Sequence, residues 1–153
     1  MTSLSLSNRP RALKNKKLDL IQVPPIPIGH HAHEHAFDLQ VYYEDTDFSG
    51  VVYHANYLKF LDRAREHFFG VNKLRDLYEK TGRGFVVYQL KIKYCQSARF
   101  GDELQVVTQE SRRTTYRAFL DQEIIRPSDG TTIVRAKVEV ALVDKNHRVV
   151  SID

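Results

Sequence analysis

The sequence is poor in cysteine, lacks tryptophan and contains no long apolar run. Its single cysteine, Cys95, permits no internal disulfide and cannot form a thiolate zinc site by itself. No segment approaches the roughly 18 apolar residues of a membrane helix, and the N-terminal region lacks the apolar block of a secretory signal. We therefore expect a cytoplasmic protein in a reducing compartment, with no membrane span and no redox chemistry.

The chain length of 153 residues corresponds to one domain, and 42% hydrophobic residues are enough to bury a core. Proline and positive charge concentrate in residues 1–36, which hold four of the five prolines and five basic residues against two acidic ones. Residues 37–153 carry 18 basic and 17 acidic residues, so they offer no broad positive surface to a nucleic acid. We predict an N-terminal extension, residues 1–36, a folded domain, residues 37–153, and no nucleic-acid partner.

The extension has two further interpretations. Its serine-rich and arginine-bearing start is typical of an organelle transit peptide, and equally of any flexible extension. Its clustered histidines could bind a metal ion, but a segment without fixed geometry binds metals adventitiously more often than functionally. We therefore expect no functional metal site at these histidines, which are His30, His31, His33 and His35.

Hydrophobic periodicity changes along the domain from strand to helix and back to strand. Alternating apolar residues predict a strand over residues 37–43, and apolar spacings of three and four predict a helix over 56–69 that ends at Gly70. A shorter helical pattern runs from Val71 to Tyr78. Alternation then predicts four strands, over 86–94, from 104 onward, over 116–124 and over 134–142.

Short turn signals between these strands favour hairpins over crossovers. They lie at residues 99–102, 127–130 and 144–147. The first long helix is the only element large enough to cover one face of the resulting sheet. The order of elements therefore predicts an α+β fold in which an antiparallel sheet wraps around that helix.

The densest polar cluster follows the first predicted strand. Residues 44–47 include three carboxylates, which repel one another unless they bind a cation, take up protons or serve a function. Four residues match positions 1, 3, 5 and 6 of a calcium-binding loop, namely Asp45, Asp47, Ser49 and Gly50. However, Asn56 occupies the twelfth position, where that loop needs a bidentate Glu, and a strand stands where the entering helix should be. A calcium site is therefore disfavoured.

A catalytic interpretation depends on the start of the predicted long helix. Asn56 is a favourable N-cap residue, and the first N–H groups of a helix have no partner inside it. Gly50 leaves room for the backbone to approach a ligand. Asp47 could then act as base or nucleophile while these N–H groups stabilise an oxyanion, an arrangement suited to hydrolysis of an activated acyl group. Because an ordinary Asp, with a pKa of about 3.9, is a weak base, a thioester is a better substrate than an amide.

His54 and Tyr43 are candidates for orienting Asp47, the water molecule or the carbonyl group. Each also has a structural alternative. His54 could be an exposed residue with a local hydrogen bond, and Tyr43 could be part of the core of the first strand. Cys95 has no histidine or asparagine nearby in the sequence, so we expect it to be a small packing residue rather than a nucleophile.

The run from Tyr43 through Asp47-Phe-Ser-Gly-Val-Val-Tyr-His54 to Arg65 closely resembles the signature of YbgC-type acyl-CoA thioesterases, relatives of 4-hydroxybenzoyl-CoA thioesterase in the hotdog-fold superfamily. A weaker similarity extends to about residue 150. The resemblance implies that Asp47 is the catalytic carboxylate, that a backbone N–H near His54 polarises the thioester carbonyl, and that Tyr43 and His54 are accessory residues. The N-terminal extension is longer than is usual in this branch.

The resemblance also implies a five-stranded sheet around the helix, homodimers joined into homotetramers, active sites at the dimer interface, and catalysis without a cofactor or metal. Four arginines could pair with the phosphates of coenzyme A or simply be surface charges. Five aromatic residues could line an acyl pocket or simply form the core. The arginines are Arg99, Arg112, Arg113 and Arg117, and the aromatic residues are Phe60, Phe68, Phe69, Phe85 and Tyr88.

The sequence therefore predicts an acyl-CoA thioesterase in which Asp47, His54 and Tyr43 form the site. Two alternatives share the fold: a thioesterase that acts on acyl carrier protein, and a dehydratase, which would need a different arrangement of Asp and His. A third alternative is a binding module that recognises acyl-CoA, acyl carrier protein or another protein without turnover.

Overall fold

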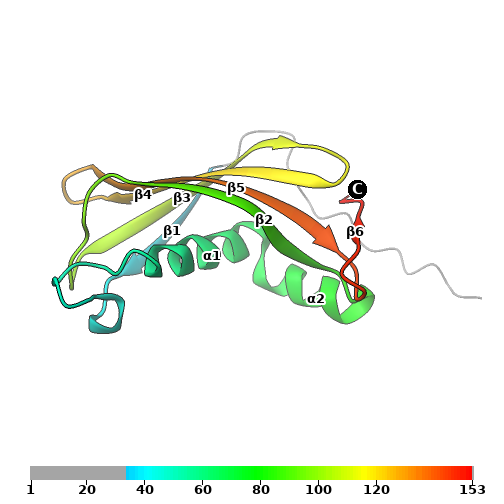
Figure 1. Cartoon of the computed structure of the whole chain (residues 1–153), viewed down its shortest axis with the longest axis horizontal. Helices are drawn as coiled ribbons and strands as arrows, with labels where there is room; N and C mark the ends of the chain where they lie inside the picture. Colours follow the sequence, from blue (N-terminus) through cyan, green and yellow to red (C-terminus); the bar gives the residue numbers. More distant parts are fainter. Residues whose placement is uncertain (1–33, 153) are drawn as a thin grey trace, which may run out of the picture.

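An antiparallel sheet lies over two consecutive helices in the computed structural model, which describes residues 34–152 (Figure 1). None of the helices in this part of the chain is long and apolar enough to cross a bilayer. The elements in chain order are β1 (His35–Gln40), a 3-10 turn (Tyr43–Asp45), α1 (Asn56–Phe69), α2 (Val71–Thr81), β2 (Gly84–Tyr94), β3 (Glu103–Arg113), β4 (Arg117–Arg126), β5 (Thr131–Val143) and β6 (Val149–Val150).

The strands follow the order β1-β3-β4-β5-β2, all antiparallel, and the two-residue β6 pairs with β5. The predicted α+β fold, a five-stranded antiparallel sheet around a long helix, is confirmed, with β6 as a short addition. The predicted hairpin at residues 99–102 is wrong. Among the described strands β2 pairs with β5 alone and β3 lies between β1 and β4, so the connection between β2 and β3 passes from one edge of the sheet to the strand next to the other edge.

Helix α1 begins and ends at the predicted residues. Its apolar positions, spaced by three and four, face the sheet, and Tyr57, Leu61 and Ala64 are each at most 3% exposed. The helix ends at Gly70, whose φ of 91° is disfavoured for residues with a Cβ. The chain then turns directly into α2. The side of the sheet that α1 covers carries most of the core, including Leu104, Val106, Ala118, Leu120, Ile124, Val134, Val138 and Val140.

The first strand is shorter than predicted. It ends at Gln40, and the backbone then forms a 3-10 turn that begins at Tyr43. Tyr43 is 76% exposed, so its interpretation as a core residue of the first strand is wrong. Val41, in contrast, is fully buried and anchors the connection.

Helix α1 and strand β2 run in opposite directions. Before the start of α1, the His54 carbonyl accepts a hydrogen bond of 3.1 Å from the hydroxyl of Tyr94, the last residue of β2. At the end of α1, Phe69 stacks on Phe85 near the start of β2, with ring centroids 4.8 Å apart. The loop before α1 and the helix α2 after it therefore lie at opposite ends of the molecule (Figure 1).

Strand β2 is an edge of the sheet. It pairs with β5 on one side, and its other side has no strand partner in the part of the chain that the structure describes. Val86, Val87 and Tyr88 are 42%, 48% and 63% exposed. An unpaired edge with exposed apolar side chains is a typical site for pairing with another strand.

Candidate active site

The loop that carries Asp47 is a small hairpin rather than an irregular segment. Thr46 and Val52 form an isolated antiparallel bridge, and the Asp47 N–H donates to the Val51 carbonyl at 3.0 Å. The Gly50 N–H returns to the Asp47 carbonyl at 3.0 Å. Gly50 has a φ of 78°, so the turn itself requires glycine here. The hairpin places Asp47 at the beginning of an exposed turn.

Ser49 holds the Asp47 carboxylate in place. Oδ1 of Asp47 accepts a 2.8 Å hydrogen bond from the Ser49 N–H and a second, shorter one from the Ser49 hydroxyl. These two donors, the hydroxyl first, lower the pKa of Asp47 below its ordinary value, and the nearby His54 ring adds a smaller effect. The carboxylate is therefore ionised at neutral pH, and its other oxygen, Oδ2, has no hydrogen bond among the described residues.

Unpaired N–H groups lie at the start of α1, as predicted, but Asn56 does not cap them. Ala55 is the N-cap residue, and the Asn56 side chain instead donates to the Asp45 carbonyl at 3.0 Å. The N–H groups of His54, Ala55 and Tyr57 make no hydrogen bond within residues 34–152. They form the partial positive site expected at a helix N-terminus.

Asn56 and Asp45 have structural roles at this site that the sequence did not predict. The Asp45 carbonyl accepts both the Asn56 amide and the Tyr53 N–H, which ties the hairpin to α1. The Asp45 carboxylate is buried and accepts the Tyr42 N–H at 2.8 Å. Asp45 is thus committed to the backbone. Across the described residues, no group of three or more histidine, cysteine or acidic side chains could hold a metal ion.

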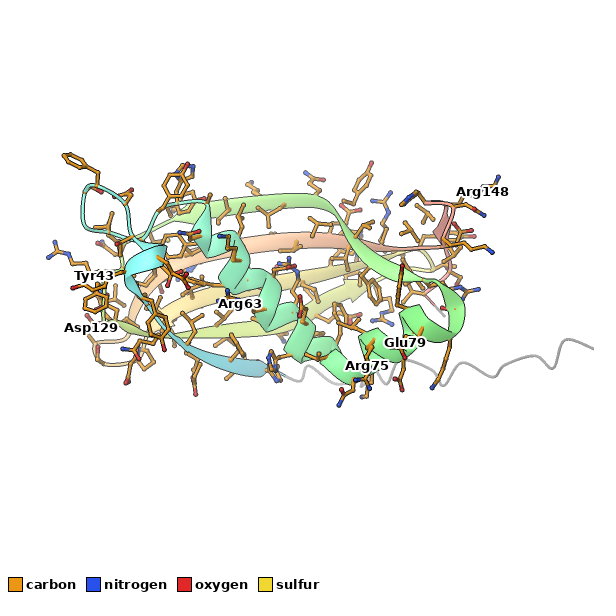
Figure 2. All side chains as sticks on the ribbon, turned by 90° about the horizontal axis from the view of Figure 1, so that it is seen from below. Tyr43, Arg63, Arg75, Glu79, Asp129 and Arg148 are labelled. Atoms are coloured by element: carbon orange, nitrogen blue, oxygen red, sulfur yellow. The ribbon has the colours of Figure 1, made fainter. Side chains whose placement is uncertain are left out.

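Tyr43 and His54 lie at the same end of the molecule as Asp47, but each contacts aromatic neighbours. Tyr43 stacks on Phe100, with centroids 4.0 Å apart and nearly parallel planes, at the end marked by its label in Figure 2. The His54 ring packs against Tyr53 at 4.5 Å and edge-on to Tyr94 at 6.2 Å. No hydrogen bond joins either side chain to Asp47 within the described chain.

Three of the four candidate arginines already have partners. Arg113 pairs with Glu110, Arg117 pairs with Glu139 and lies 3.5 Å from the centre of the Tyr88 ring, and Arg112 lies over Phe119. Arg99 is exposed, and its guanidinium has no ion pair among residues 34–152. Of the candidate aromatic residues, Phe60 and Phe69 are buried, Phe68 and Phe85 pack against the core, and Tyr88 is exposed.

Cys95 is half-buried directly after β2. Its thiol lies 3.8 Å from the Lys93 carbonyl, and no histidine is in contact with it in the described structure. Of the clustered histidines, His35 is the first residue of β1, and His30, His31 and His33 lie outside the described residues.

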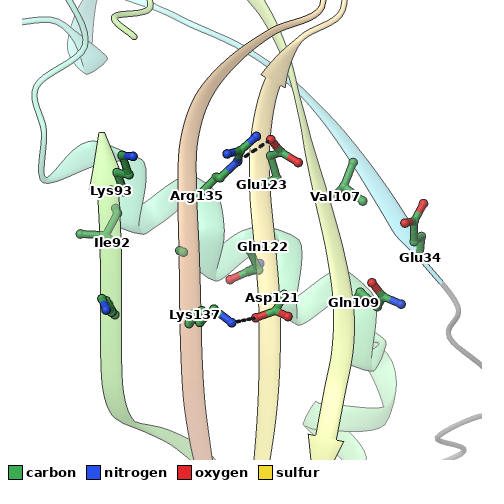
Figure 3. A pocket seen from close by; sticks show the side chains of 12 residues that line it. Glu34, Ile92, Lys93, Val107, Gln109, Asp121, Gln122, Glu123, Arg135 and Lys137 are labelled. Atoms are coloured by element: carbon green, nitrogen blue, oxygen red, sulfur yellow. Dashed lines mark hydrogen bonds and ion pairs between the residues drawn. The ribbon is translucent and has the colours of Figure 1, made fainter. Parts of the chain in front are cut away.

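Asp47 lines neither of two cavities in the described part of the chain. One, of about 360 Å³, lies on the face of the sheet turned away from α1 (Figure 3). Four of its seven charged residues form ion pairs, Arg135 with Glu123 and Lys137 with Asp121. The other, of about 330 Å³, lies between α1, α2 and the start of β2.

An antiparallel sheet around one long helix is the architecture of the hotdog fold. Residues 41–153 match the thioesterase-like superfamily. The chain belongs to this family, and the predicted resemblance is confirmed.

Two relatives and one more distant structure illustrate the similarity. Acyl-CoA thioesterase YbgC of Haemophilus influenzae is 39% identical over 111 residues, which cover 71% of this chain and 80% of that protein. The crystal structure of Probable Thioesterase from Bartonella henselae is 39% identical, covers 77% of this chain and 96% of its own, and has a TM-score of 0.66. Slr0204, a 1,4-dihydroxy-2-naphthoyl-CoA thioesterase from Synechocystis, is 21% identical and has a TM-score of 0.72. The match covers 79% of this chain and 90% of the Slr0204 chain, and at this identity it supports the fold alone.

Proposed function

We propose that this chain hydrolyses acyl-CoA thioesters and that Asp47 is the catalytic carboxylate. The relatives named acyl-CoA thioesterase support the reaction. The observation that carries the assignment of Asp47 is its geometry: an ionised carboxylate with one oxygen held by Ser49 lies on the hairpin that leads into the unpaired N–H groups of His54 and Ala55. An acyl carrier protein as donor of the acyl group is the nearest alternative.

The reaction follows from these two features. The free oxygen of Asp47 either attacks the thioester carbonyl carbon or removes a proton from a water molecule that attacks it. The carbonyl oxygen becomes an oxyanion, which the N–H groups at the start of α1 stabilise. Collapse of the tetrahedral intermediate breaks the C–S bond and releases the thiolate. If water attacks, the free acid forms directly, and the proton that Asp47 has taken up passes to the thiolate. If Asp47 attacks, a mixed anhydride forms, and a water molecule then hydrolyses it to the free acid, restores the Asp47 carboxylate and supplies the proton of the thiol. His54 and Tyr43 orient the reacting groups in this proposal.

The proposal includes a homodimer formed through the free edges of β2. Two copies that pair antiparallel there bring the end of one β2 strand next to the start of the other. Because Tyr94 lies beside His54 and Phe85 lies beside Phe69, the reactive hairpin of one copy then faces the α1–α2–β2 cavity of the other. This arrangement encloses the oxyanion site and excludes water from it, which strong oxyanion stabilisation needs. Dimers join into tetramers, and the enzyme is cytoplasmic.

The test is thiol release from aliphatic and aromatic CoA esters, and from one acyl carrier protein thioester, by the wild type and by Asp47→Asn. We expect the substitution to lower kcat/KM by about 10²–10⁴-fold. Asp121→Asn, which changes an exposed carboxylate on the far face of the sheet, is the matched control and should leave the rate unchanged. Equally slow release by wild type and Asp47→Asn, with CoA ester binding retained, would make the chain a binding module.

A further inference from the structure

The cavity between α1, α2 and β2 combines an aromatic wall with charged groups. Its volume of about 330 Å³ lies at the lower end of the range for small-molecule sites. Phe69 and Phe85 stack along it, and Leu74, Val86 and Val140 add apolar surface. Such a lining suits a small organic group with a hydrocarbon or aromatic body.

Four charged residues line the same cavity. The positively charged ones are more buried than the negatively charged ones. The two guanidinium groups are the enclosed ones: the Arg65 side chain is only 7% exposed, and Arg83 is half-buried. The two carboxylates lie at the solvent side: the Asp62 side chain is 60% exposed, and Glu66 is also exposed. The two charges of each sign balance, but the positive groups lie inside the cavity and the negative groups face the solvent, which screens them.

The charge of Arg65 is incompletely compensated. Its guanidinium donates to the neutral Gln122 amide at 2.9 Å and to Asp62 at 2.6 Å. Burial nevertheless lowers the pKa of Arg65, because the loss of hydration outweighs the attraction of Asp62. Gln122 in turn donates to Thr108 and to the Leu61 carbonyl, so it fixes the guanidinium without neutralising it.

Arg83 is available to a ligand. It lies between α2 and β2, and its guanidinium forms no ion pair and no hydrogen bond within the described part of the chain. Backbone N–H groups, that of Arg148 first, and the nearby charge of Arg83 lower the pKa of Asp144, but the Arg83 and Asp144 side chains form no ion pair. A guanidinium that lines a cavity without an ion pair is suited to bind a carboxylate through two parallel hydrogen bonds.

We propose that this cavity selects acyl groups that end in a carboxylate, that is, monothioesters of dicarboxylic acids, with Arg83 as the direct partner of the carboxylate and Arg65 as the buried charge behind it. The inference rests on the proposed function, in which the hairpin of a second copy presents the thioester to this cavity. The acyl body then lies along Phe69 and Phe85, and its far end reaches Arg83.

Coenzyme A offers a second source of negative charge in its phosphates. The size and the apolar lining of the cavity favour the acyl carboxylate, because a phosphorylated adenosine is larger and more polar than the group that the cavity can enclose. The experiment therefore includes substrates without the nucleotide.

The first test compares kcat/KM for adipoyl-CoA and hexanoyl-CoA, which have six acyl carbons each and differ in the terminal carboxylate. We expect wild type to prefer adipoyl-CoA by about tenfold or more and Arg83→Met to lose that preference, since a site built for a polar group rejects an analogue that lacks it. Arg83→Lys should retain part of the preference. Arg75→Met, which removes an exposed cation from the preceding helix α2 (labelled in Figure 2), is the matched control and should retain all of it.

Two results would overturn the inference. In the first, wild type hydrolyses adipoyl-CoA and hexanoyl-CoA with the same kcat/KM, and so does Arg83→Met. The other is a loss in Arg83→Met that is the same for both esters and disappears with the corresponding acyl-pantetheine thioesters, which would assign Arg83 to a phosphate.

A binding measurement separates this inference from the proposed reaction. Hexanoate and hexanamide, which share a hydrocarbon body and differ in the carboxylate, are titrated by calorimetry into full-length Asp47→Asn, with and without Arg83→Met. Binding of hexanoate alone, abolished by Arg83→Met, supports the carboxylate site even if no thioester is hydrolysed. If hydrolysis depends on Asp47 but neither compound binds, the proposed function stands and the carboxylate site is rejected.

Discussion

The two ends of helix α1 expose complementary features. At its start, Asp47 and the N–H groups of His54 and Ala55 lie open to solvent on a tightly hydrogen-bonded hairpin. At its end, a cavity with an aromatic wall and a buried cation contains no nucleophile or base positioned like Asp47. One end carries the reactive groups of the proposed reaction, and the other carries the aromatic cavity. In the proposed homodimer, each complete site takes one end from each of the two chains.

The comparison predicts that breaking the β2 edge separates the two half-sites. Val87→Lys places a charge on that exposed edge, which disfavours strand pairing between copies. We expect a monomer by sedimentation and a fall in kcat/KM of about 100-fold, since the oxyanion site loses its enclosure. Val149→Lys changes a valine that is equally exposed, at 48%, on β6 and should remain an active dimer. A fully active monomer of Val87→Lys would contradict the two-chain site.

Mixing two inactive variants tests whether the two halves of the site come from different chains. Gly84 lines the cavity, and a Cβ built there meets no atom within 4 Å, so Gly84→Leu should fill the cavity without a backbone clash. Asp47→Asn and Gly84→Leu should each be inactive alone. When equal amounts are unfolded and refolded together, random pairing should restore about one quarter of the wild-type sites.

Complementation fails if each site lies within one chain, because every chain in the mixture then carries one lesion. Activity that stays at the level of the separate variants, while mass spectrometry shows that mixed dimers have formed, would reject the shared site.

The buried polar network at the cavity end should matter more for stability than any polar contact at the outer surface. Gln122→Leu removes the amide oxygen that accepts a hydrogen bond from Arg65 and the amide N–H groups that donate to the Leu61 carbonyl and to Thr108, and leaves a buried guanidinium with fewer partners. We expect a loss of about 2–4 kcal/mol in the free energy of unfolding, measured by urea titration. Gln105→Leu, which removes an exposed hydrogen bond to Asp38, should cost less than about 0.5 kcal/mol. Similar losses in both variants would contradict the special role of the network.

The smallest effect concerns pH at the reactive end. The Ser49 hydroxyl and N–H lower the pKa of Asp47, so the ionised carboxylate persists to lower pH than that of an ordinary Asp, and activity is lost only as the pH falls through the lowered value. Ser49→Ala removes the hydroxyl and raises the pKa. The acid limb of the kcat/KM profile should then shift to higher pH, with less than about a threefold change at pH 7.

Ser49→Thr keeps the hydroxyl and should restore the wild-type profile. An acid limb that stays in place in Ser49→Ala would show that Asp47 is not the group whose ionisation controls the rate.

The sequence predicted the local features well because they depend on short-range patterns. The bounds of α1, its end at Gly70 and the presence of unpaired N–H groups before it follow from apolar spacing and glycine conformation. The pairing of β2 with β5 did not follow, because strand order depends on long-range contacts that turn signals do not encode. The exposed position of Tyr43 was missed because alternation continued beyond the point at which the chain leaves the sheet.

The cavity and its charged lining also could not be predicted from the sequence. Gln122 interrupts the apolar side of β4 between Leu120 and Ile124, which is a visible irregularity, but only the fold shows that it meets Arg65 from α1. Phe69 and Phe85 were recognised as aromatic candidates, yet their stacking across two elements required the three-dimensional arrangement.

The length of helix α1 sets the distance between the reactive hairpin and the cavity end of the molecule. Its 14 residues span about 21 Å between the hairpin and Gly70. In a two-fold assembly this length must match the overlap of the paired β2 strands. The match decides whether the hairpin of one chain meets the α1–α2–β2 cavity of the other. An insertion or deletion within α1 would displace both sites of the assembly together and rotate one end against the other by about 100° per residue. Loops elsewhere can change in length more freely than this helix.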